Sequence, residues 1–468
     1  MQEMKANLSE KDRKNRDMIL NDSMWKVVLR IGTPLALYQL LTVLFSIFDT
    51  MMAGHISSVS VSAVAYLSQI NNILSAVGGG LAIGAGIEIS KAYGQGEYLL
   101  VKKQVSSLYA MVLTAGLVIL GAILPFTESF LRFCRTPEEL ISAGAAYFRV
   151  QLLVMVVTIL NDVYISVQRA RGNSRHIMNL NLLAIAVKLS LTAIFVYLLN
   201  GTLVQVAEAS LISQALLLVI AIVNSRDGDS VFGFSLHAVR LDREVNLPMI
   251  IRSLPVTAEK ALFAFGKSIV NTMCTAYGAL MVGAMGVSNN LGGITTNPQN
   301  GYKDGSAAII SQNYGAGKFD RILSAFYVTA VYDMILGAVI SGIELLNLYA
   351  LSSLFSNGDL AFTELIANVY RYEALGAIPL GLNAAVLGLL YGIGETRLGM
   401  ILNLLRVFVF RIPVFKLLQR FTAFGDKIPG LVMFISNTLT GIASIFFAVY
   451  VIRKLKRSHK EERELINS

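Results

Sequence analysis

The sequence contains few of the residues on which catalytic and metal sites depend. Only 15% of its 468 residues are charged, and it has two cysteines, four histidines and one tryptophan. The histidines show no metal-ligand spacing, and no Ser-His-Asp or Cys-His pattern occurs at a common depth. A Walker sequence is also absent, so the Tyr-Gly-x-Gly segments at 93–96 and 314–317 are no phosphate loops. We expect their glycines to end helices with left-handed caps. We therefore expect no enzyme, no metal centre and no cofactor.

The two cysteines give a weaker indication. Cys134 and Cys274 fall one in each half of the chain, near the same predicted membrane face. A disulfide across the halves is one reading, and two free thiols are the reading that we favour.

Apolar residues are abundant. Hydrophobic residues make up 54% of the chain, and the mean hydropathy is +0.61. This composition leaves too little polar surface for a soluble protein of this length. Twelve apolar spans can be read between residues 27 and 452, and most reach the ~20 residues that a bilayer core requires. The sequence predicts an all-α integral membrane protein with twelve transmembrane helices.

The second half of the chain repeats the first at a spacing of 221 to 222 residues. The repeat preserves glycines, a tyrosine, an asparagine and arginines rather than generic leucines. The matched pairs include Pro34 and Pro255, Gly80 and Gly301, Gly84 and Gly305, Tyr93 and Tyr314, Gly96 and Gly317, Arg149 and Arg371, Asn161 and Asn383, Gly172 and Gly394, Arg175 and Arg397. Duplication in a membrane chain indicates a transporter with its site between the halves. Six spans per half predict two lobes with the same orientation.

The basic residues predict the topology. If both termini are cytoplasmic, the inner segments hold 25 Lys and Arg residues and the outer loops hold four. This asymmetry follows the positive-inside rule. It also explains the net charge of +9 without a nucleic-acid partner. The predicted parts are a cytoplasmic tail 1–26, a lobe 27–225, a cytoplasmic linker 226–246, a second lobe 247–453 and a cytoplasmic tail 454–468.

Several ionisable residues fall inside predicted spans. A charge at the bilayer centre costs about 3 kcal/mol or more unless it is paired or faces water. Asp49 and Lys188 lie too deep to reach an interface, and Asp162 lies in the inner half of the fourth span. Asp49 and Lys188 either form a structural pair or line a cavity, and we favour the cavity.

Three sets of residues resemble the multidrug and toxic compound extrusion (MATE) transporters. They are the run from Phe45 to Gly54, the paired Tyr-Gly-x-Gly elements, and Gly392 to Arg397 followed by Asn403, Arg406 and the segment from Arg411 to Pro413. The resemblance covers roughly residues 27–453. It implies a V-shaped fold of two pseudo-symmetric six-helix lobes. It also implies alternating access and export of amphipathic compounds in exchange for H⁺ or Na⁺.

The resemblance assigns site residues one by one. Asp49 matches the acidic residue of the first span that the family uses for cation coupling, and Glu259 lies on the span where many members hold an acidic residue. The fifth span departs, because Lys188 and Thr192 replace an Asn-x-x-x-Asp pattern. An Asp–Lys pair could itself exchange the proton, so we predict H⁺ coupling over Na⁺. The predicted coupling residues are Asp49, Asp162 and Lys188.

The remaining polar residues of the spans are candidates for a substrate cavity. They are Asn161, Thr192, Glu259, Lys260, Asn271 and Asn383. For Asn161 and Asn383, a structural bond between helices is an equal alternative. We expect a monomeric multidrug efflux antiporter in the plasma membrane, with small amphipathic molecules and membrane lipid as partners. A lipid or lipid-linked oligosaccharide flippase of the same superfamily is the alternative.

Overall fold

The computed structural model describes residues 6–56, 58–134, 136–227, 230–240, 242–356 and 358–467. Within the helices, the side chains of 46–51, 53–56, 58–63, 65, 143, 279, 462, 463 and 465–467 lie outside the described part. The described chain is helical throughout, apart from connecting turns and one isolated bridge between Asn7 and Ser230. The predicted all-α class is confirmed.

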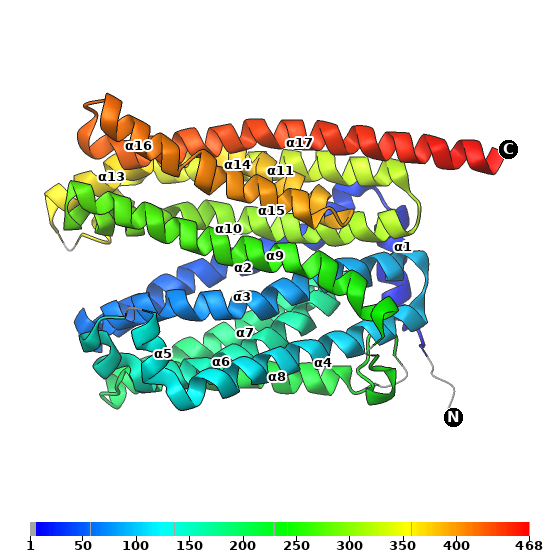
Figure 1. The fold of residues 1–468 in the computed structure, drawn as a ribbon, viewed down its shortest axis with the longest axis horizontal. Coiled ribbons are helices and arrows are strands. Elements are labelled where there is room, and N and C mark those ends of the chain that lie inside the picture. Colours follow the sequence, from blue (N-terminus) through cyan, green and yellow to red (C-terminus); the bar gives the residue numbers. More distant parts are fainter. Residues whose placement is uncertain are drawn as a thin grey trace. The chain divides into compact units, whose positions relative to one another are not determined.

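Figure 1 shows long helices joined by short connections. The α-helices are α1 (Glu10–Asn21), α2 (Met24–Ile56), α3 (Ser58–Gln95), α4 (Tyr98–Ile123), α5 (Thr127–Phe133), α6 (Glu138–Ala170), α7 (Ser174–Ala193), α8 (Leu203–Ser225), α9 (Arg243–Cys274), α10 (Ala279–Gly315), α11 (Phe319–Leu346), α12 (Leu348–Ser353), α13 (Leu360–Leu375), α14 (Ala377–Gly392), α15 (Thr396–Leu404), α16 (Ile412–Phe421) and α17 (Ile428–Asn467). Two π-helical turns, η2 (Ile194–Leu198) and η5 (Leu405–Val409), follow α7 and α15.

Contacts divide the chain into two compact units. Unit 1 comprises Met1–Asp17 and Leu44–Ala261, and unit 2 comprises Met18–Val43 and Leu262–Ser468. The first part of α2 therefore belongs to unit 2, and the first part of α9 belongs to unit 1. The lobes predicted above follow chain order rather than these contacts, and their boundaries stay a prediction.

In unit 1, glycines of α3 allow α9 to approach closely. A Cβ atom at Gly80 would lie 2.7 Å from Thr257 Cα, and one at Gly84 would lie 2.3 Å from Ser253 Cα. Ser253 Oγ donates to the Leu81 carbonyl at 3.1 Å, and Arg252 Nε donates to Glu88 at 3.0 Å. Small residues let helix backbones meet in this way inside membranes.

Unit 2 contains the counterpart of this crossing between α10 and α2. A Cβ atom at Gly301 would lie 2.6 Å from Ala36 Cα, and Gly305 lies against Gly32. Ala36 precedes Thr257 by 221 residues, as Gly80 precedes Gly301. Equivalent residues of the two repeats therefore make equivalent helix contacts in the two units.

Glycines end two of the matched helices. Gly96 follows α3 with φ +85°, and Gly317 lies two residues beyond α10 with φ +68°. The prediction of left-handed caps is confirmed for the second glycine of each Tyr-Gly-x-Gly segment, whereas Gly94 and Gly315 lie within the helices.

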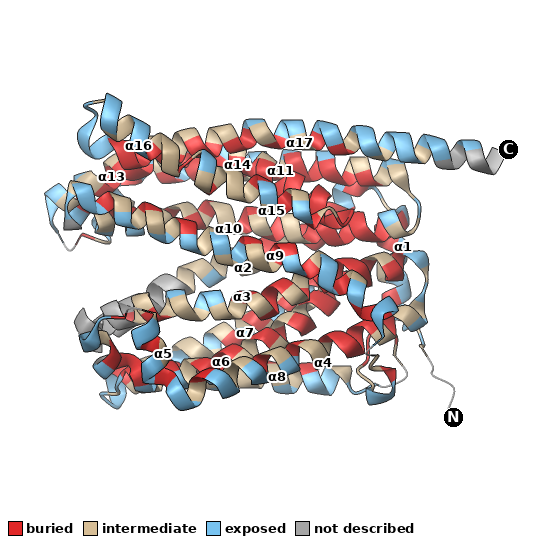
Figure 2. Ribbon diagram, viewed as in Figure 1, coloured by how far each residue is buried: buried red, intermediate tan, exposed pale blue. Residues whose placement is uncertain are grey.

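Figure 2 shows many exposed residues along the helices, and a number of them are large and apolar. Val118 of α4 is 65% exposed and Phe446 of α17 is 70% exposed. Surfaces of this kind suit a lipid environment. Within the described residues, nine helices are long and apolar enough to span a membrane, or ten if α13 and α14, which meet at 48°, form one span.

The predicted count of twelve spans is not reached by this criterion. The α9 and α10 helices are 32 and 37 residues long, so their length suffices. They are not among the apolar helices, because α9 carries several charges and α10 is rich in glycine, asparagine and threonine. Polar side chains in long helices of a membrane protein generally face the protein interior or a watery cavity.

Candidate functional site in the helices of each unit

In unit 1, a carboxylate and an ammonium group meet between three helices. A Cβ atom added to Gly79 of α3 would lie 3.1 Å from Lys260 Nζ and 3.4 Å from Asp162 Oδ2. Asp162 belongs to α6 and Lys260 to α9, and the two interact electrostatically. The absence of a side chain at Gly79 leaves room for both groups. Asp162 was predicted for cation coupling and Lys260 for the substrate cavity, so the structure brings together residues from the two predicted sets.

Asn161, the neighbour of Asp162, points to another helix. Its Nδ2 donates to both the backbone oxygen and Oε1 of Gln214 in α8, each at 2.9 Å, and the residue is 1% exposed. Asn383 of α14 makes a similar bond to Ser444 Oγ of α17 at 3.1 Å. These bonds are the interhelical kind named above as the alternative. A part in the substrate cavity stays a prediction for both.

The other predicted residues occupy separate places. Thr192 and Glu259 are buried in α7 and α9, and Lys188 is half-buried in α7. Asn271 is half-buried near the end of α9, in unit 2. Asp49 lies in α2, and its side chain lies outside the described residues. The roles assigned to these residues above stay predictions.

Unit 2 contains a polar cavity that the sequence did not single out. Its volume is about 270 Å³, and its lining includes Lys267 of α9, Glu373 of α13, Arg406 of η5 and Arg411 beside α16. These four groups interact electrostatically. Three cations and one carboxylate give the cavity a cationic balance. The sequence signal was present as isolated charges inside spans, but their convergence depends on tertiary structure.

Hydrogen bonds hold the charged groups of this cavity. Arg411 is 2% exposed, and it donates from Nε to Ser436 Oγ at 3.1 Å and from Nη2 to Asn437 Oδ1 at 3.0 Å. Arg406 Nε donates to the same Asn437 Oδ1 at 3.3 Å. Glu373 accepts a hydrogen bond from Ser288. Arg406 lies in a π-helical turn, a backbone form that is frequent at functional sites.

A second buried carboxylate in unit 2 has neutral partners. Glu344 of α11 accepts hydrogen bonds from Tyr370 of α13 and from Thr295 of α10, the latter at 2.8 Å. Each partner comes from a different helix, so one carboxyl group joins three helices. Burial with hydroxyl donors is the arrangement that makes a buried carboxyl group tolerable.

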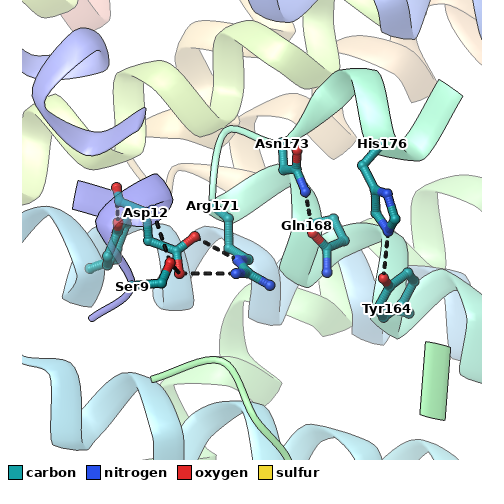
Figure 3. Close-up of polar contacts among 8 residues, drawn as sticks. Ser9, Asp12, Tyr164, Gln168, Arg171, Asn173 and His176 are labelled. Carbon is teal, nitrogen blue, oxygen red and sulfur yellow. Dashed lines mark hydrogen bonds and ion pairs between the residues drawn. The ribbon is translucent and has the colours of Figure 1, made fainter. Parts of the chain in front are cut away.

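Figure 3 shows a polar cluster at one end of unit 1. Arg171 donates from Nε and Nη2 to the two carboxylate oxygens of Asp12, both at 2.9 Å, and Asp12 is 1% exposed. Tyr93 donates to the Asp12 backbone oxygen at 2.8 Å. Nearby, the Tyr164 hydroxyl lies 2.9 Å from His176 Nε2. The two-pronged ion pair attaches the first part of α1 to unit 1, which the sequence did not predict.

Within the described residues, no three His, Cys, Asp or Glu side chains are grouped so as to hold a metal ion. The charged groups described above combine carboxylates with lysine or arginine side chains. Such groups in membrane helices typically line ion or substrate paths.

Comparison with known sequences identifies the family. The sequence model of the MatE family matches this chain twice, over residues 34–194 and over residues 255–415. The second match begins and ends 221 residues after the first, which is the spacing of the internal repeat.

Curated relatives are similar along most of the chain. The multidrug export protein MepA of Staphylococcus haemolyticus is 22% identical over 80% of this chain and 83% of its own length. MepA of Staphylococcus aureus is 21% identical over 92% of this chain and 91% of its own. The probable multidrug resistance protein YoeA of Bacillus subtilis is 23% identical over 68% and 70% of the two chains.

Solved structures share the fold. An outward-facing multidrug resistance MATE family transporter of the MOP superfamily superposes with a TM-score of 0.90 at 17% identity, covering 96% of this chain and 99% of that one. A MOP superfamily transporter from Pyrococcus furiosus gives the same TM-score, identity and coverage. Since the family model covers more than half of the chain and both of its repeats, this protein belongs to the MatE family of membrane transporters.

Proposed function

We propose that this protein is a secondary active antiporter that exports amphipathic organic compounds in exchange for H⁺ by alternating access. Family membership and the multidrug export relatives support the transport of small molecules. The observation that carries the coupling mechanism is the meeting of Asp162 and Lys260 beside Gly79.

The pair can exchange a proton for physical reasons. Asp162 is half-buried and Lys260 is exposed, and a carboxylate and an ammonium group that lie close together stabilise each other's charge. A proton on Asp162 removes the negative charge of its carboxylate and so weakens its attraction for Lys260. A cationic substrate that approaches Asp162 would displace Lys260 in the same way. An antiporter requires that proton and substrate do not bind at the same time, and competition for one carboxylate meets this requirement.

The same pair disfavours Na⁺ as the coupling ion. Sodium requires several oxygen ligands, whereas the Lys260 ammonium next to Asp162 repels a cation. Asp49 remains in this proposal as a second coupling carboxylate, with Lys188 as a group that can neutralise one of the acids. The proposed substrate-cavity residues are unchanged: Asn161, Thr192, Glu259, Lys260, Asn271 and Asn383.

We place the protein in the plasma membrane with both termini in the cytoplasm. The excess of Lys and Arg in alternate loops supports this orientation. We propose that it works as a monomer, since each half supplies its own polar centre. The lobes 27–225 and 247–453 would rock about the linker 226–246.

A lipid-linked oligosaccharide or lipid flippase is the second candidate. The cationic balance of the cavity in unit 2 favours it, because such a flippase must bind anionic phosphate groups. The relatives that are named multidrug export proteins oppose it. Small-molecule export is therefore the preferred function.

Ethidium efflux from cells without their own drug pumps tests the proposal. We expect efflux by the wild type that stops when the proton gradient is collapsed and continues when K⁺ replaces Na⁺ in the buffer. Asp162→Asn should abolish it. The matched control is Glu128→Gln, which removes an acid that is half exposed and paired with Arg149 at 3.3 Å. Strict dependence on Na⁺ would contradict the proposed coupling, and absence of efflux by well-folded wild type would favour the flippase.

A further inference from the structure

The cavity of unit 2 has more positive than negative groups. Lys267, Arg406 and Arg411 line it together with a single carboxylate, that of Glu373. They lie in helices or at a helix end of a membrane protein, where an uncompensated charge is costly. A cavity with this balance is electrostatically incomplete without an anion.

The hydrogen bonds made by these groups do not supply the missing charge. Arg411 donates to Ser436 and Asn437, and Arg406 donates to Asn437, so the described hydrogen-bond acceptors of both guanidinium groups are neutral oxygens. Glu373 accepts from the Ser288 hydroxyl. Neutral oxygens satisfy donors but leave the net charge unchanged. An anionic ligand would provide both acceptors and countercharge.

The rest of the lining indicates the shape of the ligand. Phe263 stacks with the Arg406 guanidinium, whose Cζ lies 5.5 Å from the ring centroid. Met433, Leu380 and Ala374 add further apolar surface. A volume of about 270 Å³ suits a compact molecule rather than a lipid. The combination of a cationic group and an apolar wall fits an aromatic ring that carries a carboxylate.

We propose that the cavity of unit 2 binds small aromatic carboxylates. The inference deepens the proposed export function, on which it rests, by adding organic anions to the substrates. Arg406 and Lys267 bind the carboxylate, and Phe263 packs against the ring. Arg411 holds Asn437 in place and adds positive charge. Unit 1, with its acid–base pair, would then serve proton exchange while unit 2 receives the anion.

Binding is tested on the purified full chain in detergent, with benzoate as the probe. Benzoate should raise the apparent melting temperature in a saturable way. Benzyl alcohol has the same ring without charge and should have no such effect. Sulfate, which carries charge without a ring, should bind more weakly than benzoate.

Two variants locate the site. Arg406→Gln and Lys267→Gln should each weaken benzoate binding about tenfold, as expected for the loss of one hydrogen bond to a charged group. The matched control is Lys416→Gln, on α16 and outside the residues that line the cavity. Calorimetric titration at a fixed temperature measures the benzoate affinity directly. A variant that folds but melts at a lower temperature can therefore still be compared with the wild type. If Arg406→Gln does not fold, Lys267→Gln decides, since Lys267 is only half-buried.

The outcomes separate this inference from the proposed function. No saturable benzoate binding, equal binding of sulfate, or unchanged affinity in Lys267→Gln would each overturn the anion site. None of these results alters ethidium efflux, which tests the export proposal independently. Benzoate binding that is lost in Lys267→Gln, in a protein that does not export ethidium, would support the site and refute multidrug export.

Discussion

Replacement of Gly84 by alanine tests the helix crossing that relates the two repeats. An added Cβ would lie 2.3 Å from Ser253 Cα, whereas ordinary contacts are 3.4–4 Å. The obstacle is backbone, so no side chain can rotate away, and α3 and α9 must separate by about 1 Å. Overpacking of this kind costs about 1–3 kcal/mol. Alanine recovers up to about 1 kcal/mol through its higher helix propensity.

Gly121 of α4 provides the control, because a Cβ there would meet nothing within 4 Å. Gly121→Ala should gain stability through helix propensity alone. The difference between the two variants is therefore about 1–3 kcal/mol. For a unit of roughly 200 residues, this corresponds to several degrees in the melting temperature.

The assay is the fraction of protein that stays monodisperse on size exclusion after heating in detergent. Gly84→Ala should melt several degrees below Gly121→Ala, and Gly301→Ala should behave like Gly84→Ala because its Cβ would lie 2.5 Å from Ala36 N. A melting temperature of Gly84→Ala equal to or above that of Gly121→Ala would refute the close crossing.

Two further predictions concern buried charges. Asp12→Ala leaves the Arg171 guanidinium, 18% exposed, without its carboxylate and should destabilise the protein by about 3 kcal/mol, measured as loss of heat resistance in the same assay. Arg171→Ala should reduce stability less in the Asp12→Ala background than in the wild type. Strictly additive losses of stability would contradict the ion pair. Asp333 is fully buried, with neither carboxylate oxygen hydrogen bonded among the described residues, so Asp333→Asn should leave stability unchanged or raise it. A large loss of heat resistance in that variant would show that the carboxylate has an essential partner.

The large-scale organisation was predictable because it depends on patterns along the chain. Apolar composition determined the helical membrane class, and glycine spacing revealed the duplication. The left-handed conformations of Gly96 and Gly317 followed from their position after long apolar runs. The membrane class and the glycine conformations have local causes in neighbouring residues, whereas the duplication is found by comparing the two halves of the sequence.

The site was less predictable because charged side chains meet through tertiary packing. Asp162 was identified from its depth in a span. Its neighbour Lys260 belongs to α9, and no sequence pattern links the two residues. Arg406 and Arg411 lie more than 30 residues from Glu373 in sequence, and only the fold brings them to one cavity. The count of twelve spans stays a prediction, because α9 and α10 are long enough to span a membrane but too polar to be counted by apolar composition.

Proton counterflow in proteoliposomes tests most directly whether Asp162 and Lys260 couple transport to H⁺. Ethidium is added to vesicles that contain the purified protein and an internal pH dye, in Na⁺-free buffer. The account predicts a pH change that depends on ethidium for the wild type and for Glu128→Gln, and none for Asp162→Asn. Ethidium transport by the wild type without proton movement, or undiminished proton movement in Asp162→Asn, would contradict it.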